Sequence, residues 1–252
     1  MAIRILFLLI SLAGFGQSVT QLYPELGALI DKSEKEEAEF IELKKQCDDF
    51  YNSNVAQLER SKLSKEQKKL AEKCDFEMES YWDVLGPGCS WYCGAGEDTI
   101  SASSYLKSAK IDYSPKNIHD LDYKSAWIEG VKGYGIGEFV VYHFPPENPR
   151  ITEIIVVNGY VKSAKLWKEN SRVKKLKMYV DDNVFAVLNL SDSRNEQHFK
   201  IGPLGYSDRQ NWDILKNKPW WTIKFEILEV YPGSKFEDTV ITEIYFDGID
   251  VH

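Results

Sequence analysis

Beyond its N-terminus, the sequence has no apolar run of the roughly 20 residues that a helix needs to cross a bilayer. It therefore predicts no transmembrane segment. The chain also lacks an excess of basic residues, because 31 Lys and Arg stand against 39 Asp and Glu, for a formal net charge of -8. An acidic balance disfavours binding to nucleic acid or anionic lipid. We expect neither as a partner.

Catalytic motifs are missing as well. The four histidines are scattered, and none has a second ligand at metal-binding spacing on a helix. Residues 88–92 begin like a hydrolase nucleophile elbow but lack its second glycine. The GxGxG at 133–137 precedes a β-rich run, whereas phosphate binding needs a helix N-terminus. A glycosidase carboxylate pair has no sequence support. The sequence thus predicts a protein that is not an enzyme.

The N-terminus is typical of a secretory signal peptide. Residues 1–4 carry one positive charge, residues 5–15 are almost entirely apolar, and small residues follow. We predict cleavage after Gly16 and an exported chain. No cysteine follows the apolar run, so lipid attachment is not expected.

The segment 24–80 has the composition and spacing of helices. It is rich in Glu, Lys, Ala and Leu, and apolar residues recur at helical intervals from Leu26 to Phe50. Ser64 and Gln67 form a capping box at the start of a second helix. The pattern predicts a helical hairpin with its turn at 58–63.

The chain has four cysteines, an even number, and export permits disulfides. We predict the pairs Cys47–Cys74, which the hairpin would place side by side, and Cys89–Cys93, which a local turn separates. A zinc site of four thiolates is the alternative. It is disfavoured because Cys89 and Cys93 are spaced more widely than a CxxC knuckle.

Beyond residue 100, short runs rich in β-branched and aromatic residues predict strands. No helical stretch separates them, which favours an antiparallel sandwich or barrel. The predicted organisation is a signal peptide at 1–16, a helical segment at 17–85, a cysteine-containing connector at 86–99 and a β domain at 100–252.

An acidic cluster precedes Trp127. Its hard oxygen ligands come from Asn117, Asp120, Asp122 and Ser125, but Ser125 stands where an EF-hand requires glycine. From the residues alone, a turn held by Asx hydrogen bonds and a calcium loop are equally good interpretations.

Several stretches together resemble a known family. They are SASSYL at 101–106, SAWIEGVKGYGIGEFV at 125–140, IIVVNGYVKS at 154–163, ENSRVKKL at 169–176, VYPGSKFEDTVITEIYF at 230–246, and the accompanying GCSWYCG at 88–94. In this order they resemble the discoidin, or coagulation factor 5/8 type C, superfamily, most closely its bacterial NAD glycohydrolase translocation (NADase-type glycan-binding) branch.

The resemblance implies a mainly β, discoidin-like (galactose-binding-like) jelly-roll β-sandwich that binds carbohydrate and often holds a structural Ca²⁺. Its calcium ligands correspond to Asp120, Asp122, Ser125 and Glu243, although this chain lacks the Asp-Gly-Asp-like loop of many relatives. The enzymatic half of the toxin that names the branch lies outside the match. We therefore expect no NAD binding or hydrolysis.

Sugar rings stack on aromatic faces, and their hydroxyls bond to planar polar side chains. The loop 158–172 has that mixture, so we predict a glycan site there, with Trp91 and Tyr92 as a second platform. In the alternative interpretation, the loop's asparagines hold turns and its Trp packs on the sandwich edge. The predicted loop ligands are Asn158, Tyr160, Trp167, Asn170 and Arg172.

Taken together, the sequence predicts an exported bacterial protein, periplasmic, cell-surface or secreted, that binds a glycan or glycoconjugate without catalysis. The alternative is a structural or protein-interaction module whose partner is an envelope protein. An exposed apolar stripe on the helical segment would favour such a partner, whereas a stripe packed on the sandwich would favour a supporting role.

Overall fold

The computed structural model describes residues 18–53, 55, 58–74, 80–85, 89–96, 99–207 and 211–251. The predicted signal peptide lies outside the described residues. The α-helices are α1 Glu34–Tyr51, α2 Lys65–Lys73, α3 Ala164–Glu169 and α4 Trp212–Leu215. The strands are β1 Thr20–Leu22, β2 Glu25–Leu29, β3 Thr99–Ala102, β4 Trp127–Ile128, β5 Phe139–Phe144, β6 Arg150–Asn158, β7 Ser171–Val180, β8 Asn183–Asn189, β9 Asn195–Leu204, β10 Trp221–Tyr231 and β11 Thr239–Ile249.

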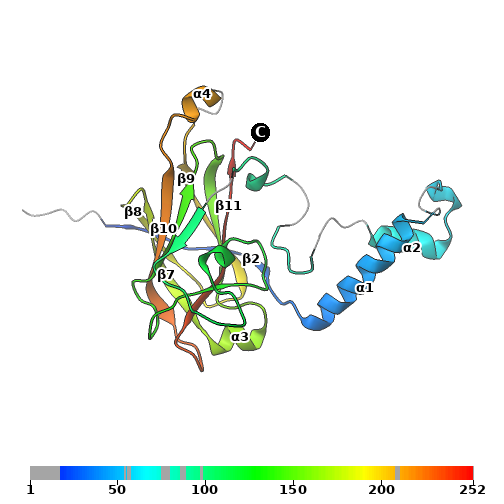
Figure 1. Ribbon diagram of the computed structural model, residues 1–252, viewed down its shortest axis with the longest axis horizontal. Helices are drawn as coiled ribbons and strands as arrows, with labels where there is room; N and C mark the ends of the chain where they lie inside the picture. Colours follow the sequence, from blue (N-terminus) through cyan, green and yellow to red (C-terminus); the bar gives the residue numbers. More distant parts are fainter. Residues whose placement is uncertain are drawn as a thin grey trace, which may run out of the picture.

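The strands form a discoidin-like jelly-roll β-sandwich, as predicted (Figure 1). They pair in the order β2-β9-β6-β11-β7-β10-β5-β3, with β1 beside β8 and β4 beside β11. Strand β11 joins the two layers, because its start pairs in parallel with β7 and the rest pairs antiparallel with β6. Its residues are accordingly buried over most of its length.

The core between the layers is dominated by aromatic rings. Tyr142 and Phe144 of β5 meet Phe246 of β11 edge to face, at centroid distances of 5.1 and 5.3 Å. Trp91 contacts the same group from a short 3-10 turn, Trp91–Cys93. Alternate residues of β5 and β10 are buried, which is the period-two pattern of strands with one face in a core.

The predicted helical segment is wrong at its beginning, because residues 20–22 and 25–29 are strands of the sandwich. Strand β1 pairs in parallel with β8, and β2 pairs antiparallel with β9. A Cβ at Gly27 would lie 2.4 Å from His198 Nε2, so β2 passes close to this side chain, and a larger residue at position 27 would require the ring to shift. Leu26 and Leu29 thus serve strand pairing although their side chains are exposed, Ile30 is buried, and helical structure begins only after the N-cap, Ser33.

The helical hairpin and its disulfide are confirmed. Cys47 of α1 and Cys74 after α2 are bonded, with Cα atoms 5.4 Å apart. Ser64 forms the predicted capping box with Gln67. Figure 1 shows α1 and α2 extending away from the sandwich, while α3 and α4 lie at its opposite ends. No helix in the described ranges combines the length and apolarity needed to cross a membrane.

The second predicted disulfide is not formed in this structure. Cys89 and Cys93 are exposed thiols that hydrogen-bond to each other. The backbone N–H of Ser90 also donates to Cys93 Sγ at 3.4 Å, and this turn lowers the pKa of Cys93. The two thiols therefore lie in one local turn without a covalent bond between them.

Candidate functional site

The loop predicted to bind glycan brings its residues together, but it turns them inward. Asn158, at the end of β6, is fully buried. Its Nδ2 donates to the Val173 carbonyl at 2.7 Å, and its Oδ1 accepts from the Val173 N–H at 3.0 Å. Both polar atoms of this amide therefore join β6 to β7, and neither is available to a ligand.

Arg172 and Trp167 are engaged in the same way. The Arg172 guanidinium lies 4.3 Å from the Trp167 ring centroid and donates to Asp192 at 2.7 Å. Trp167 Nε1 donates to the Asn158 carbonyl at 2.9 Å. The buried Asn170 closes α3 by donating to the Leu166 carbonyl. These contacts correct the glycan prediction for this loop and support the alternative in which its residues hold turns and pack on the sandwich.

Trp91 and Tyr92 do not form a platform for sugar, which is a second correction. Trp91 is 1% exposed, and its Nε1 donates to the Pro149 carbonyl at 2.9 Å. The Tyr92 hydroxyl accepts from the Phe246 N–H at 3.0 Å. The aromatic surface of this segment fills the core.

The predicted calcium residues converge where the loop 120–125 meets strand β11. Ser125 Oγ donates to Asp120 Oδ2 at 2.7 Å. The Asp122 N–H lies 3.2 Å from both Asp120 Oδ1 and Glu243 Oε1. Leu121 adopts the left-handed region, with φ of 60°, which glycine adopts more easily. The turn bonds of the Asx interpretation are therefore present.

The buried carboxyl group of Glu243 distinguishes this cluster from an ordinary turn. It is fully buried, and its Oε2 has no hydrogen-bond partner among the described residues. Burial, followed by the hydrogen bond and charge of Asp120, raises the pKa of Glu243 well above its usual range. Burial likewise raises the pKa of Asp122. A buried carboxylate with an orphaned oxygen beside two further acids fits a hard cation, although no three acids of the described chain are already spaced as its ligands.

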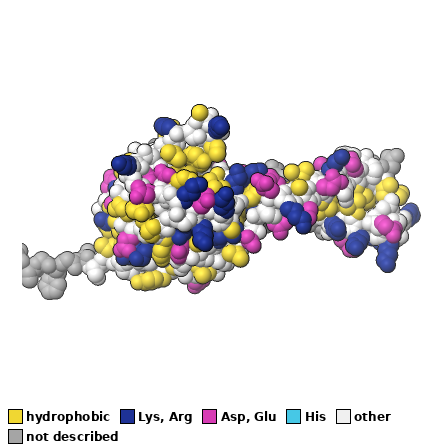
Figure 2. Space-filling view, turned by 90° about the horizontal axis from the view of Figure 1, so that it is seen from below, with side chains coloured by type: hydrophobic (Ala, Val, Ile, Leu, Met, Phe, Trp, Pro, Cys, Tyr) yellow, Lys and Arg dark blue, Asp and Glu magenta, His cyan; other side chains and the backbone are white. Residues whose placement is uncertain are grey.

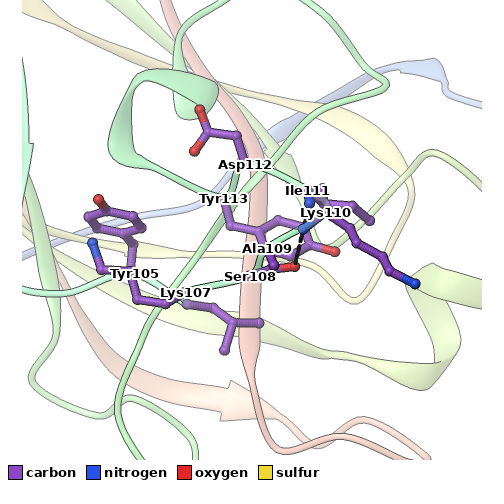
Figure 3. Close-up of a pocket in the computed structure, with 9 residues that line it drawn as sticks. Tyr105, Lys107, Ser108, Ala109, Lys110, Ile111, Asp112 and Tyr113 are labelled. Carbon is purple, nitrogen blue, oxygen red and sulfur yellow. Dashed lines mark hydrogen bonds between the residues drawn. The ribbon is translucent and has the colours of Figure 1, made fainter.

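A pocket that sequence reasoning missed lies in the loop after β3, at residues 105–113. It has a volume of about 520 Å³. Figure 3 shows the loop side chains around it, with Tyr105 and Tyr113 among them and Ser108 Oγ bonded to the loop's own backbone. The Lys107 ammonium lies 3.3 Å from the Tyr105 ring centroid. Aromatic rings, hydroxyls and charges thus border one hollow.

Contacts fix both ends of this loop to the rest of the sandwich. A Cβ at Gly130 would lie 2.4 Å from the Tyr105 carbonyl oxygen, so the backbones touch there. At the other end, Tyr113 packs edge-on against Tyr160, with centroids 6.4 Å apart. Tyr160, predicted as a glycan ligand, is 5% exposed, and its ring packs against Tyr113. Two tyrosines with Lys, Ser and Asp between them were the available sequence signal for this loop.

A protein-family model described as "NAD glycohydrolase translocation F5/8 type C domain" matches residues 91–247, more than half of the chain. The chain belongs to this family. The resemblance found in the sequence is therefore confirmed, and the hairpin with β1 and β2 lies outside the part that defines this F5/8 type C family. No curated protein matches the sequence.

Solved structures show weaker likenesses to this F5/8 type C chain. CpGH89CBM32-5 of Clostridium perfringens, in complex with GalNAc-beta-1,3-galactose, is 12% identical, with 60% of this chain and 95% of that one covered and a TM-score of 0.42. The CBM32-1 and CBM32-2 domains of Clostridium perfringens ZmpB, in complex with GalNAc, are 11% identical over 87% of this chain and 52% of that one, with a TM-score of 0.42. The mycobacterial arabinofuranosyltransferase AftD is 15% identical over 62% and 11%, with a TM-score of 0.42.

Proposed function

We propose that this chain is an exported, non-catalytic carbohydrate-binding protein whose glycan site is the pocket at residues 105–113. The observation that carries the proposal is the grouping of two tyrosines with polar side chains around a hollow of about 520 Å³. A hollow of this size suits a small ligand. Membership of the F5/8 type C family supports the same function.

The pocket supplies both kinds of contact that a sugar needs. The Tyr113 ring offers an apolar face to the C–H side of a pyranose, whereas one face of Tyr105 is covered by the Lys107 ammonium. Lys110 and Asp112 offer a charged donor and a charged acceptor to its hydroxyls. The hydrogen bond from Lys116 lowers the pKa of Asp112, so this carboxylate is ionised and accepts hydrogen bonds at neutral pH.

Export is supported by the Cys47–Cys74 disulfide, because such bonds persist in oxidising compartments. We also propose a structural Ca²⁺ held by Asp120, Asp122 and Glu243, with Ser125 beside them. Its charge would neutralise the buried Glu243 carboxylate together with the two Asp carboxylates, and would fix the loop 120–125 to β11. NAD has no part in this function, and we expect no turnover of NAD by the pure protein.

A glycan array tests the proposal, with the purified protein compared with a Tyr113→Ala variant. Galactose- and GalNAc-terminated glycans are suitable first probes. We expect selective binding that Tyr113→Ala weakens about tenfold, corresponding to ~1.4 kcal/mol. Tyr23→Ala is the matched control, since Tyr23 is 73% exposed and lies outside the pocket. A blank array from folded protein, or equal losses in the two variants, would contradict the proposal.

The hairpin supports a second candidate function, binding of an envelope protein. Ile41 and Tyr51 of α1 are 60% and 56% exposed, and the buried residues of α1 are Cys47 and Phe50. An apolar surface that does not pack on the sandwich is the feature expected of a docking element. Ile41→Asp with Tyr51→Asp should abolish capture of a cross-linked envelope partner and leave glycan binding unchanged. Unchanged capture would exclude this surface.

A further inference from the structure

A second pocket, of about 490 Å³, lies where the helical extension meets the sandwich. Four separate parts of the chain line it: residues 31–34, which lead into α1; Trp82; Lys124; and residues 162–166, which lead into α3. Residues 31–34 and Trp82 lie outside the part of the chain that matches the family. This pocket is therefore a property of the whole chain and cannot be formed by the F5/8 type C part alone.

The segment that carries Trp82 is held firmly against the sandwich. Trp82 is 2% exposed and packs with Ile30, Tyr123 and Val161. The Tyr123 N–H donates to the Trp82 carbonyl at 3.0 Å, and the Val84 N–H donates to the Leu121 carbonyl at 3.0 Å. These bonds make one wall of the pocket part of the folded core, so the pocket is preformed.

Four lysines line this pocket, and two of them have neither an ion pair nor a hydrogen bond in the described part of the chain. Lys124 donates to Glu37 at 2.6 Å, and Lys32 donates to the Tyr81 carbonyl. Lys162 and Lys165 have neither kind of partner among the described residues. Two acids, Asp31 and Glu34, also line the pocket, and Asp31 is paired with Arg194. Figure 2 shows Lys and Arg side chains gathered on the face seen from below, the end that carries α3.

We infer that this pocket binds the anionic group of an acidic sugar, a carboxylate or a sulfate. The ammonium groups of Lys162 and Lys165 would pair with the anion. The Ser163 hydroxyl, which accepts from the Leu166 N–H, still has a proton to donate to a sugar hydroxyl. Ala164 and Leu166 provide an apolar wall for the ring, which a free inorganic anion would not need, and the buried Trp82 closes the floor behind them.

The inference deepens the proposed function, on which it rests, but the two pockets are separate. They share no lining residue. We call the pocket lined by residues 31–34 and 162–166 the lysine pocket, and the pocket at 105–113 the tyrosine pocket. The two are also close, because Leu166 of the lysine pocket packs on the same small cluster as Leu106 and Tyr113 of the tyrosine pocket. A glycan with an acidic residue beside a neutral one could therefore use both.

The test is a titration of the full protein with N-acetylneuraminic acid, glucuronic acid, GalNAc and inorganic sulfate, followed by calorimetry and amide NMR shifts. We expect the acidic sugars to bind and to shift the amides of residues 163–166. Lys162→Ala with Lys165→Ala should weaken the acidic sugars about tenfold, because two partly exposed ion pairs are lost. Lys69→Ala with Lys132→Ala, which removes the same charge from exposed sites, should change nothing.

Three results would overturn the inference: acidic sugars that bind no tighter than GalNAc, sulfate that binds as tightly as the sugars, or equal losses in the test and control pairs. The NMR shifts of the unaltered protein decide the location even if a variant fails to fold. Failure of the tyrosine pocket is distinguishable, because Tyr113→Ala acts on GalNAc whereas the lysine pair acts on the acidic sugars. An effect of Tyr113→Ala alone would thus leave the proposed function standing and remove the lysine pocket.

Discussion

The loops at 105–113 and 158–172 contain similar residues and use them in opposite ways. Both have aromatic rings beside amides, hydroxyls or charges. In the loop 158–172, Asn158, Asn170 and Arg172 bond to backbone and to Asp192, and all three are buried. In the loop 105–113, the tyrosines are half-buried and surround a hollow. Residue type indicates what a side chain can bind, whereas its neighbours in the fold decide what it does bind.

The largest expected effect is a loss of stability at Trp91, the core residue that the sequence predicted to be a glycan platform. Trp91→Ala should lower the free energy of unfolding by about 4 kcal/mol, because a buried Trp leaves a large cavity. Urea denaturation measures it. Tyr134→Ala, at a tyrosine that is 37% exposed, is the control and should cost far less. Similar losses in the two variants would show that Trp91 is not a core residue.

Asn158→Ala should also destabilise the fold, by about 3 kcal/mol, because it leaves the buried N–H and C=O of Val173 without partners. Asn183→Ala, at an exposed asparagine with one hydrogen bond to the Asp181 carbonyl, is the matched control. Chemical denaturation of the pair tests the structural role of the loop 158–172. A stable Asn158→Ala variant that had lost glycan binding would restore the original prediction.

Glu243 connects the acidic cluster to pH and calcium. Because its folded pKa is raised, the folded state keeps a proton that the unfolded state has lost, so stability is full below the ordinary Glu pKa and falls as pH rises above it. Calcium should offset this fall, by ~2.7 kcal/mol at a hundredfold excess over Kd. Thermal unfolding with Ca²⁺ and with a chelator, from acid to neutral pH, measures both effects.

Glu243→Gln is the matching variant for that experiment, because the amide keeps the size of the side chain and removes its titration. The fall in stability with rising pH and the response to calcium should both diminish. A wild-type protein whose melting temperature ignores calcium at neutral pH would argue against the ion, and the Asx turn would then be sufficient.

The smallest effect on stability is expected at Tyr113, where the comparison predicts loss of function without loss of fold. Tyr113→Ala should cost about 1 kcal/mol or less of folding free energy, since the ring is only half-buried. Its binding loss on a glycan array should nevertheless exceed that of Asn158→Ala once both are compared as folded protein. The reverse ranking would exchange the roles assigned to the two loops.

Local patterns were sufficient for much of the fold. The capping box at Ser64 and the helical spacing around Cys47 led to the hairpin and its disulfide, because helix periodicity and caps depend on residues a few positions apart. The same local reasoning failed at Leu26, where pairing with β9 outweighs helical spacing. It also paired Cys89 with Cys93, whose separation permits either a disulfide or the turn that the structure has.

Patterns in the sequence were enough to predict the hairpin, the family and six of the strands, β5 to β8, β10 and β11, whereas β1 and β2 were interpreted as helix. The family resemblance predicted the convergence of the acids at 120–125 with Glu243. Only the tertiary structure decided which aromatic and polar groups face solvent, because exposure depends on contacts between segments distant in the chain. Asn158 meets Val173, and Trp91 meets Phe144 and Phe246, only after β-strands have paired. The lysine pocket is likewise assembled from residues 31 to 166, and no local pattern could have predicted it.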